Sequence, residues 1–251
     1  MHWVIQKSIF KPANYERLAT TLDRFGIPYT SVSIANGTFD MLPDVTVAGK
    51  VYVCGALKLA HIARNKGWVP GSFLNAHFSF DIWLRELGAE MLNADIKSGA
   101  LAQVKHPSGS RFFIRPLEDN KAFDGMVIDG ETLADWRRDP AKSHLQQMDV
   151  IVSPVKDIYR EYRLFVVNGE IITGSVYKIG GRAEMSPDVE DYVRDYARSV
   201  IARWSPAESF VIDLALTAHG LKVVEFNNIN SSGFYASDVA KYVDAIQSQY
   251  A

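Results

Sequence analysis

Three oxygen-bearing side chains, Asp213, Glu225 and Asn227, could together hold a divalent metal ion. They lie within two segments rich in Val, Leu, Ile and Phe, 210–217 and 221–227, which we expect to be β-strands. If the three share one face of a sheet, the two carboxylates repel each other unless a cation lies between them. Hard oxygen ligands of this kind suit Mg²⁺ that is held partly by phosphate oxygens. The alternative is an ordinary hairpin whose acidic side chains are solvated.

The loop between these segments predicts how they pair. Residues 218–220, Ala-His-Gly, read as a three-residue hairpin loop with glycine where the left-handed conformation is needed. The cross-strand pairs that this loop predicts are Thr217–Leu221, Ala215–Val223 and Asp213–Glu225. Asn227 lies two residues beyond Glu225, so the pleat keeps it on the same face.

A second predicted hairpin carries a group of charged side chains. Its strands, 161–167 and 170–178, flank an Asn-Gly turn signal. The pairs that follow are Val167–Glu170, Phe165–Ile172, Arg163–Gly174, Glu161–Val176 and Tyr159–Lys178. Arg163 and Lys178 then share one face, with Glu161 beside Arg163. Either these are solvated charges, or they are partly covered cations that need anions such as phosphate oxygens.

Three further positions are candidates for contacts with a bound nucleotide. Arg115 ends an apolar strand, 111–115, where a cation usually has a ligand or a carboxylate partner. Lys121 lies in a loop that could cover a ligand, although surface loops carry lysines routinely. The apolar strand 150–155 could offer backbone donors and acceptors to a purine, as any such strand could.

Composition excludes several classes of protein. The chain has 251 residues, a hydrophobic fraction of 47% and a net charge of −2, so no global basic field favours nucleic acid. The single cysteine, Cys54, lies in an apolar run and is expected in the core. No apolar run reaches the roughly 18 residues of a membrane span, and no signal-peptide pattern is present, so we expect a cytoplasmic protein. The six histidines are scattered, and neither a P-loop nor a dinucleotide-binding glycine motif occurs.

The order of the predicted elements indicates two kinds of architecture. Strands are expected at 2–10, 31–34, 44–47, 51–54, 111–115, 150–155, 161–167, 170–178, 210–217 and 221–227. Helices are expected at 14–25, 57–66, 80–87, 131–139, 188–203 and 237–249. The first part reads as an α/β lobe with a mainly parallel sheet, and the second as an α+β domain. A composition shift places the boundary between 1–97 and 98–251.

Four segments resemble, in chain order, the nucleotide-binding segments of the ATP-grasp superfamily. They are Phe112-Phe-Ile-Arg-Pro, Val150-Ile-Val-Ser-Pro-Val, Glu161-Tyr-Arg-Leu-Phe-Val-Val-Asn-Gly-Glu-Ile, and Asp213 followed by Glu225-Phe-Asn227. The 1–97 lobe is similar to the family's pre-grasp domain. Arg115, Arg163 and Lys178 together resemble a clade, found in phages and bacteria, that uses two arginines and one lysine. Arg115 stands where the superfamily commonly has lysine.

The resemblance implies an ATP-grasp fold with a nucleotide and metal site between the two subdomains of 98–251. It implies an ADP-forming ligase that joins a small-molecule or peptide carboxylate to an amine through an acyl-phosphate. Asp213, Glu225 and Asn227 would bind Mg²⁺. The residues that would bind ATP are Arg115, Lys121, Ser153, Val155, Glu161, Arg163 and Lys178. Arg163, Lys178 and Asn230 would act in catalysis, with Asn230 in the loop near the reacting carboxylate.

Two other functions use the same residues. A kinase-like phosphotransferase would need the same phosphate and metal ligands and would differ only in the acceptor. A non-catalytic nucleotide-binding module is disfavoured, because a degenerate site should lose its metal ligands first. The sequence identifies neither the substrates nor the oligomeric state.

Overall fold

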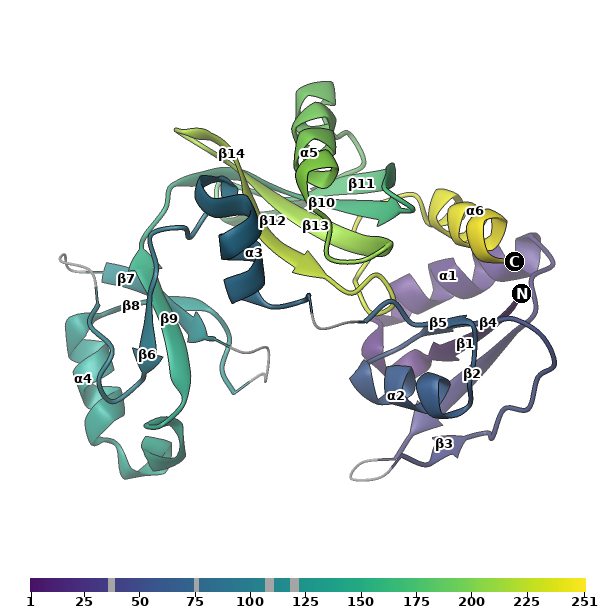
Figure 1. Cartoon of the computed structure of the whole chain (residues 1–251), viewed down its shortest axis with the longest axis horizontal. Coiled ribbons are helices and arrows are strands. Elements are labelled where there is room, and N and C mark those ends of the chain that lie inside the picture. Colours follow the sequence, from purple (N-terminus) through teal and green to yellow (C-terminus); the bar gives the residue numbers. More distant parts are fainter. Residues whose placement is uncertain (36–38, 75–76, 107–110, 118–121) are drawn as a thin grey trace. The chain divides into compact units, whose positions relative to one another are not determined.

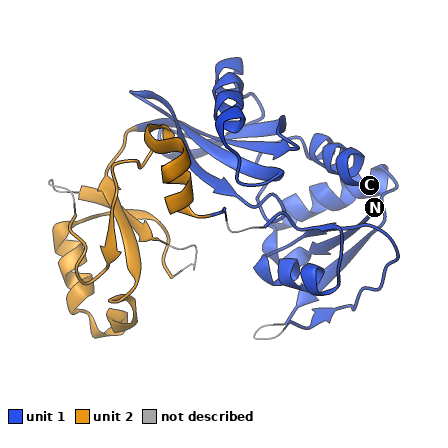
Figure 2. Ribbon diagram, in the orientation of Figure 1, with its two compact units in different colours: residues 1–78, 158–251 blue, residues 79–157 orange. Residues whose placement is uncertain are grey.

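The structure is a computed structural model that describes residues 1–35, 39–74, 77–106, 111–117 and 122–251 (Figure 1). The chain forms two compact units, coloured separately in Figure 2. Unit 1 combines residues 1–78 with 158–251, and unit 2 contains residues 79–157. Packing therefore divides the chain at other positions than the domain boundary at 97/98, which stays a prediction.

The N-terminal part of unit 1 is an α/β sheet with the order β3-β2-β1-β4-β5. Its strands are β1 (His2–Gln6), β2 (Tyr29–Ile34), β3 (Met41–Leu42), β4 (Val51–Cys54) and β5 (Pro70–Gly71), and its helices are α1 (Pro12–Arg24) and α2 (Leu57–Asn65). All neighbouring pairs are parallel except β2–β3. This confirms the mainly parallel sheet that the sequence predicts.

Alternation along β1 explains why this sheet is covered on both faces. Trp3 and Ile5 belong to a core cluster that includes residues of α1 and α6 (Val239–Tyr250). Val4 points to the other face and packs with Leu59 and Ile62 of α2. Cys54 is buried and its pKa is raised to about 12 by burial, as expected of a core thiol rather than a nucleophile.

The C-terminal part of unit 1 is an antiparallel sheet with the order β12-β11-β10-β13-β14. Its strands are β10 (Ile158–Val167), β11 (Glu170–Ile179), β12 (Arg182–Ser186), β13 (Ser209–Thr217) and β14 (Gly220–Asn227), and α5 (Asp191–Arg203) follows β12. Phe165 and Val211 of this sheet share one core cluster with Trp3 and Tyr242. The two parts of unit 1, far apart in the sequence, are therefore joined by a common core.

Unit 2 is built on an antiparallel sheet with the order β6-β9-β7-β8. Its elements are α3 (Phe80–Leu87), β6 (Lys97–Ala100), β7 (Arg111–Pro116), β8 (Met126–Asp129), α4 (Gly130–Arg138) and β9 (Asp149–Pro154). Phe112, Ile114 and Val152 fill its core together with Leu133 of α4. Short 3₁₀ helices cover Lys7–Ile9 in unit 1 and Gly88–Glu90 and Pro140–Leu145 in unit 2.

The predicted helices and most predicted strands are confirmed to within a few residues. The strand predicted at 44–47 is wrong, because Val45 packs into the core and its carbonyl accepts a hydrogen bond from the Lys66 side chain at 3.2 Å. Strands β6, β8 and β12 are additions that the sequence pattern did not indicate.

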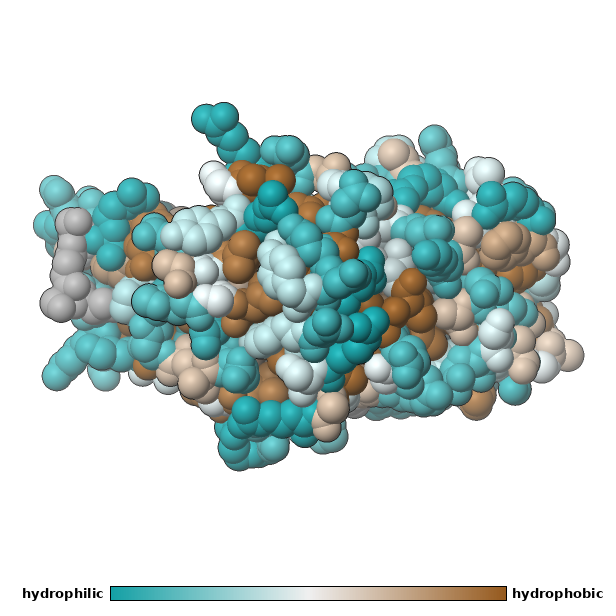
Figure 3. Space-filling view, turned by 90° about the horizontal axis from the view of Figure 1, so that it is seen from above, coloured by the Kyte–Doolittle hydropathy of each residue, from teal (hydrophilic) through white to brown (hydrophobic). Residues whose placement is uncertain are grey.

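Most of the face shown in Figure 3 is hydrophilic, with separate apolar spots. Exposed apolar side chains on the described residues include Phe39, Leu57 and Met185. Within the described ranges, no helix is both long and apolar enough to cross a membrane.

The shared core of unit 1 yields a stability prediction. Phe165 is fully buried, and its ring centroid lies 5.6 Å from that of Phe234 and 5.7 Å from that of Tyr242. We expect Phe165→Ala to lower the free energy of unfolding by about 3–5 kcal/mol, because it removes packing and leaves a cavity. Urea denaturation followed by circular dichroism measures this change. Leu57→Ala, at an exposed position, should change it by less than about 0.5 kcal/mol, and equal effects would contradict the core assignment.

Candidate active site

The hairpin of β13 and β14 places Asp213 opposite Glu225, as predicted, but through a different register. Thr217 pairs with Gly220 and Ala215 with Lys222, so the predicted pairs Thr217–Leu221 and Ala215–Val223 are wrong. The loop is one residue shorter than predicted. A bulge between Leu214 and Asp213 takes up an extra residue of β14 and restores the predicted acidic pair.

The three predicted metal ligands lie within hydrogen-bonding distance of one another. Asn227 Nδ2 donates to Glu225 Oε1 at 3.0 Å and to Asp213 Oδ2 at 3.3 Å. To offer its oxygen to a metal ion, the Asn227 amide must turn so that Oδ1 replaces Nδ2. No group of three or more His, Cys, Asp or Glu side chains in the described residues could hold a metal ion. A metal site here would therefore need the amide oxygen as its third protein ligand.

Asp213 is also held by an arginine of the neighbouring strand. Arg163 of β10 lies directly opposite Asp213, and both side chains are buried. Its Nε donates to Asp213 Oδ1 at 2.8 Å and its Nη2 to Oδ2 at 2.7 Å, which makes a two-pronged ion pair. Burial alone would lower the pKa of the guanidinium, but the Asp213 carboxylate outweighs burial and the pKa is raised. Sequence reasoning placed both residues in the site without predicting their contact.

Two stacked tyrosine rings flank Arg163. Its guanidinium carbon lies 5.0 Å from the Tyr235 ring centroid and 5.9 Å from that of Tyr177, and the two rings stack at 4.8 Å. Tyr177 donates its hydroxyl to Glu161 Oε2 at 2.8 Å. Burial, followed by the charges of Asp213 and Glu161, raises the pKa of Tyr177 far above its ordinary value. Tyr177 therefore stays a neutral donor, and neither tyrosine was among the predicted site residues.

The register of the second hairpin differs from the prediction beyond its turn. Val167 pairs with Glu170, as predicted, but Phe165 pairs with Thr173, Arg163 with Ser175 and Glu161 with Lys178. Two bulges cause the shifts, so the predicted pairs Phe165–Ile172, Arg163–Gly174, Glu161–Val176 and Tyr159–Lys178 are wrong. Lys178 still shares a face with Glu161 and Arg163, and its Nζ lies 3.2 Å from Glu161 Oε1.

Gly174 does not leave space for a ligand opposite Arg163. It pairs with Leu164, and a Cβ at position 174 would lie 2.3 Å from Leu164 Cδ2. The glycine therefore makes room for a core leucine on the opposite face.

Unit 2 brings two of its candidate residues to one face of its sheet. Arg115 pairs with Ile151 across β7 and β9, and Ser153 pairs with Phe113, two positions along. The Arg115 guanidinium carbon lies 5.2 Å from the ring centroid of Phe80 in α3. Ser153 is buried and donates to Asn93 Oδ1 at 3.1 Å, whereas Val155 is exposed. Lys121 lies outside the described residues.

Asn230, predicted to act in catalysis, is buried and bonded to backbone groups. Its Nδ2 donates to the carbonyls of Val53 and Gly71, and its Oδ1 accepts from the Phe73 amide at 3.0 Å. These bonds use both N–H donors of the side chain. They give Asn230 a positioning role, tying the loop after β14 to the first sheet, and its catalytic role stays a prediction.

A cavity of about 430 Å³ lies beside Arg163 and within the size range of ligand pockets. Its walls include Lys11, Ala13 and Asn14 at the start of α1, and Gly233 and Tyr235 in the loop after β14. A helix N-terminus with nearby cations attracts anions. Sequence reasoning missed the α1 residues, although Pro12 at the first helical position marks the helix start.

Residues 92–245, more than half of the chain, match a family described as an ATP-grasp domain. The chain belongs to this family. The ATP-grasp fold that the sequence predicted is therefore confirmed. Which arginines and lysine bind the nucleotide is a matter for the proposals below.

Solved structures share this ATP-grasp fold at low sequence identity. D-cycloserine synthetase DcsG is 13% identical with a TM-score of 0.62, over 99% of each chain. The ATP-grasp ligase PsnB, complexed with a minimal precursor, is 13% identical with a TM-score of 0.61, over 99% of this chain and 98% of PsnB. D-alanine–D-alanine ligase from Bacillus anthracis, complexed with ATP, is 12% identical with a TM-score of 0.64, over 98% of this chain and 91% of that one. Among curated proteins, none matches the sequence.

The buried Arg163–Asp213 pair yields a second prediction. Asp213→Leu should lower the free energy of unfolding by about 3–5 kcal/mol, because it leaves the buried guanidinium without its partner. The double variant Arg163→Met/Asp213→Leu should be more stable than Asp213→Leu alone. Urea denaturation of the wild type, both single variants and the double variant measures the coupling. Arg198→Met, at the exposed Arg198–Asp195 pair, should cost less than about 1 kcal/mol. Additive single effects would contradict the coupling.

Proposed function

We propose that this ATP-grasp protein is an ATP-dependent ligase that joins a carboxylate to an amine through an acyl-phosphate. The observation that carries the proposal is the convergence of Asp213, Glu225 and Asn227 on one face of the β13–β14 hairpin, beside Arg163. Two carboxylates and an amide are a donor set suited to Mg²⁺, which binds oxygen ligands together with substrate phosphates. The residues present therefore fit the metal.

The names of the similar structures support the same chemistry. PsnB is called a ligase and has been solved with Mg and ADP. The Bacillus anthracis protein is a D-alanine–D-alanine ligase and has been solved with ATP. DcsG is called a synthetase. These names describe reactions of those proteins, and we extend the ligase class to this chain as part of the proposal.

The contacts of the two basic residues of unit 1 suggest different roles. Lys178 is half-exposed and forms an ion pair with Glu161 at 3.2 Å. Exposed ion pairs contribute little, so Lys178 can turn to a phosphate at small cost. Arg163 is buried in a two-pronged pair, and giving up Asp213 would leave that carboxylate uncompensated. We therefore assign the phosphate contact in unit 1 to Lys178, and to Arg163 the holding of Asp213 beside the cavity.

The remaining nucleotide contacts belong to unit 2. Arg115 supplies a second cation for phosphates, and the backbone of β9 near Ser153 and Val155 supplies donors and acceptors for the base. Phosphoryl transfer depends on positioning and charge neutralisation more than on covalent chemistry by the protein. Bound Mg²⁺ would supply charge neutralisation at the phosphates.

The reaction balances in two steps. A carboxylate oxygen of the first substrate bonds to the γ-phosphorus of ATP as the bond to the β–γ bridging oxygen breaks, which releases ADP. The nitrogen of the amine then attacks the acyl carbon, phosphate leaves, and the nitrogen loses a proton. The cavity beside Arg163 offers a helix N-terminus and Lys11 to an anionic substrate.

The metal assignment can be tested by removing one charge. Glu225→Gln keeps the shape of the side chain but removes a charged oxygen ligand. We expect it to raise the Mg²⁺ concentration needed for half-maximal ATP binding at least about tenfold, within the range seen when groups that support a metal site are lost. Calorimetric titration of ATP at several Mg²⁺ concentrations measures this shift. Glu170→Gln, beside the turn of the other hairpin, is the matched control. Equal Mg²⁺ dependence of the two variants would refute the assignment.

The products distinguish the proposed ligase from related enzymes. With a suitable carboxylate and amine, ADP and phosphate should accumulate in step with the amide. With the carboxylate alone, hydroxylamine should trap an acyl hydroxamate, because an acyl-phosphate is electrophilic. Chromatography of nucleotides and mass spectrometry of the acyl product make both measurements. AMP and pyrophosphate would rule out the mechanism, and a phosphorylated product that survives hydroxylamine would indicate a kinase.

A further inference from the structure

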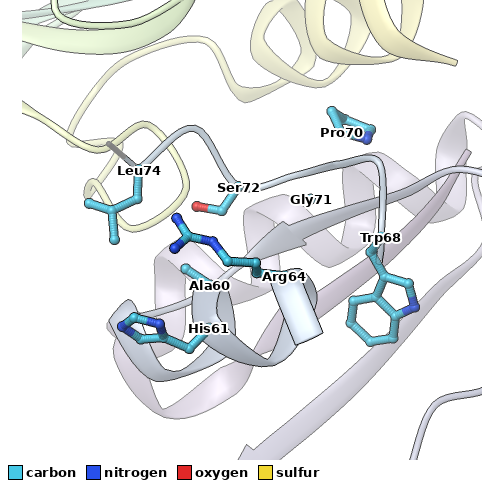
Figure 4. Close-up of a pocket in the computed structure, with 8 residues that line it drawn as sticks. All are labelled: Ala60, His61, Arg64, Trp68, Pro70, Gly71, Ser72 and Leu74. Atoms are coloured by element: carbon cyan, nitrogen blue, oxygen red, sulfur yellow. The ribbon is translucent and has the colours of Figure 1, made fainter. Parts of the chain in front are cut away.

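A second cavity lies in the N-terminal part of unit 1, away from the residues assigned to metal and phosphate. Its volume is about 180 Å³, below the range of pockets for drug-sized ligands. Its walls come from α2 and from the segment around β5, and they consist of Ala60, His61, Arg64, Trp68, Pro70, Gly71, Ser72 and Leu74 (Figure 4). A cavity of this size suits a small molecule or the end group of a larger one.

Two polar groups in this cavity await a ligand. The Oγ of Ser72 is buried, and it has no hydrogen-bond partner in the part of the chain that the structure describes. A buried hydroxyl without a partner is costly, so such a group calls for an explanation. Figure 4 shows the guanidinium of Arg64 and the hydroxyl of Ser72 directed toward the same space. Arginine and a hydroxyl are both hydrogen-bond donors, and together they suit an oxyanion.

Charge and shape favour a carboxylate over a phosphate as this oxyanion. Arg64 is the only arginine or lysine among the described residues that line the cavity, so it balances one negative charge but not two. Its planar fork matches the two oxygens of a carboxylate. The walls formed by Ala60, Pro70 and Leu74 are apolar and can accept a short apolar substituent. A small amino acid, or the C-terminal residue of a short peptide, combines these properties.

The cavity wall is anchored to the loop that follows the candidate metal strand. Asn230 bonds the carbonyl of Gly71 and the amide of Phe73, which flank Ser72 in the chain. The Gly55 amide donates to the Asn230 carbonyl at 2.9 Å. These bonds within unit 1 fix the position of Ser72 relative to the loop after β14. A ligand bound at Ser72 would therefore be held at a defined position relative to Asp213 and Glu225.

We propose that this cavity binds the carboxylate of a small amino acid or of a peptide C-terminus, through Arg64 and Ser72. The binding itself follows from the cavity, and only the ligand's role as a ligase substrate rests on the proposed function. Sequence analysis gave no sign of this site, because Arg64 and Ser72 meet only when β5 pairs beside β4.

Ligand-observed NMR with the full chain tests the proposal. Glycine, D-alanine, L-alanine and alanyl-alanine are the probes, alaninamide is the probe without a carboxylate, and inorganic phosphate is the competing anion. We expect saturation transfer to at least one carboxylate probe and none to alaninamide. Arg64→Gln should raise its Kd roughly ten- to a hundredfold, and Ser72→Ala roughly three- to tenfold, as expected for bonds to a charged group and for one neutral donor. Arg203→Gln, at an exposed arginine of α5, should leave the Kd unchanged.

The outcomes separate this site from the proposed ligase activity. Binding of a carboxylate that Arg64→Gln weakens and Glu225→Gln does not supports the site, even if no ATP-dependent product forms. Absence of carboxylate binding, binding of phosphate alone, or equal Kd values for Arg64→Gln and Arg203→Gln would overturn it. The ligase proposal would survive those results if ADP and an amide still formed together. Circular dichroism of each variant confirms that the fold is retained.

Discussion

The buried ion pair between Arg163 and Asp213 is the interaction on which the candidate site depends. Both charges lie in the sheet interior, where desolvation is costly, and only the two-pronged geometry offsets that cost. A carboxylate has about four lone-pair positions, of which Arg163 takes two and Asn227 one. The pair therefore fixes the orientation of Asp213 while leaving its oxygens capacity for a cation. It also explains why Arg163 is better suited to hold Asp213 than to bind a phosphate.

Bulges in the sheet bring the remaining polar groups into line with this pair. One bulge in the β13–β14 hairpin puts Glu225 opposite Asp213, and one in the β10–β11 hairpin puts Lys178 opposite Glu161. A one-residue change of register without a bulge would move these side chains to the other face. Bulges of this kind redirect side chains at functional sites. The polar row is thus a property of the irregularities as much as of the strands.

Packing connects the N-terminal residues to the same site. The core cluster shared by Trp3, Phe165 and Tyr242 joins the first sheet to the β10–β13 pair. Asn230 adds polar links from the loop after β14 to Val53 and Gly71. As a result, the start of α1 lies against the cavity beside Arg163, and the cavity at Arg64 and Ser72 is anchored to the loop after β14.

The sequence alone determined the helices, most strands, the ATP-grasp fold and the pairing of Asp213 with Glu225, because periodicity, turn residues and local motifs are written in neighbouring residues. Tertiary structure decided what depends on contacts between distant strands. The fork from Arg163 to Asp213 requires β10 beside β13, and the stacked Tyr177 and Tyr235 require the loop after β14. Bulges leave no mark in apolar alternation, so the registers beyond each turn could not be derived. The backbone bonds of Asn230 arise only when sequence-distant segments pack together, since such contacts carry no local signal.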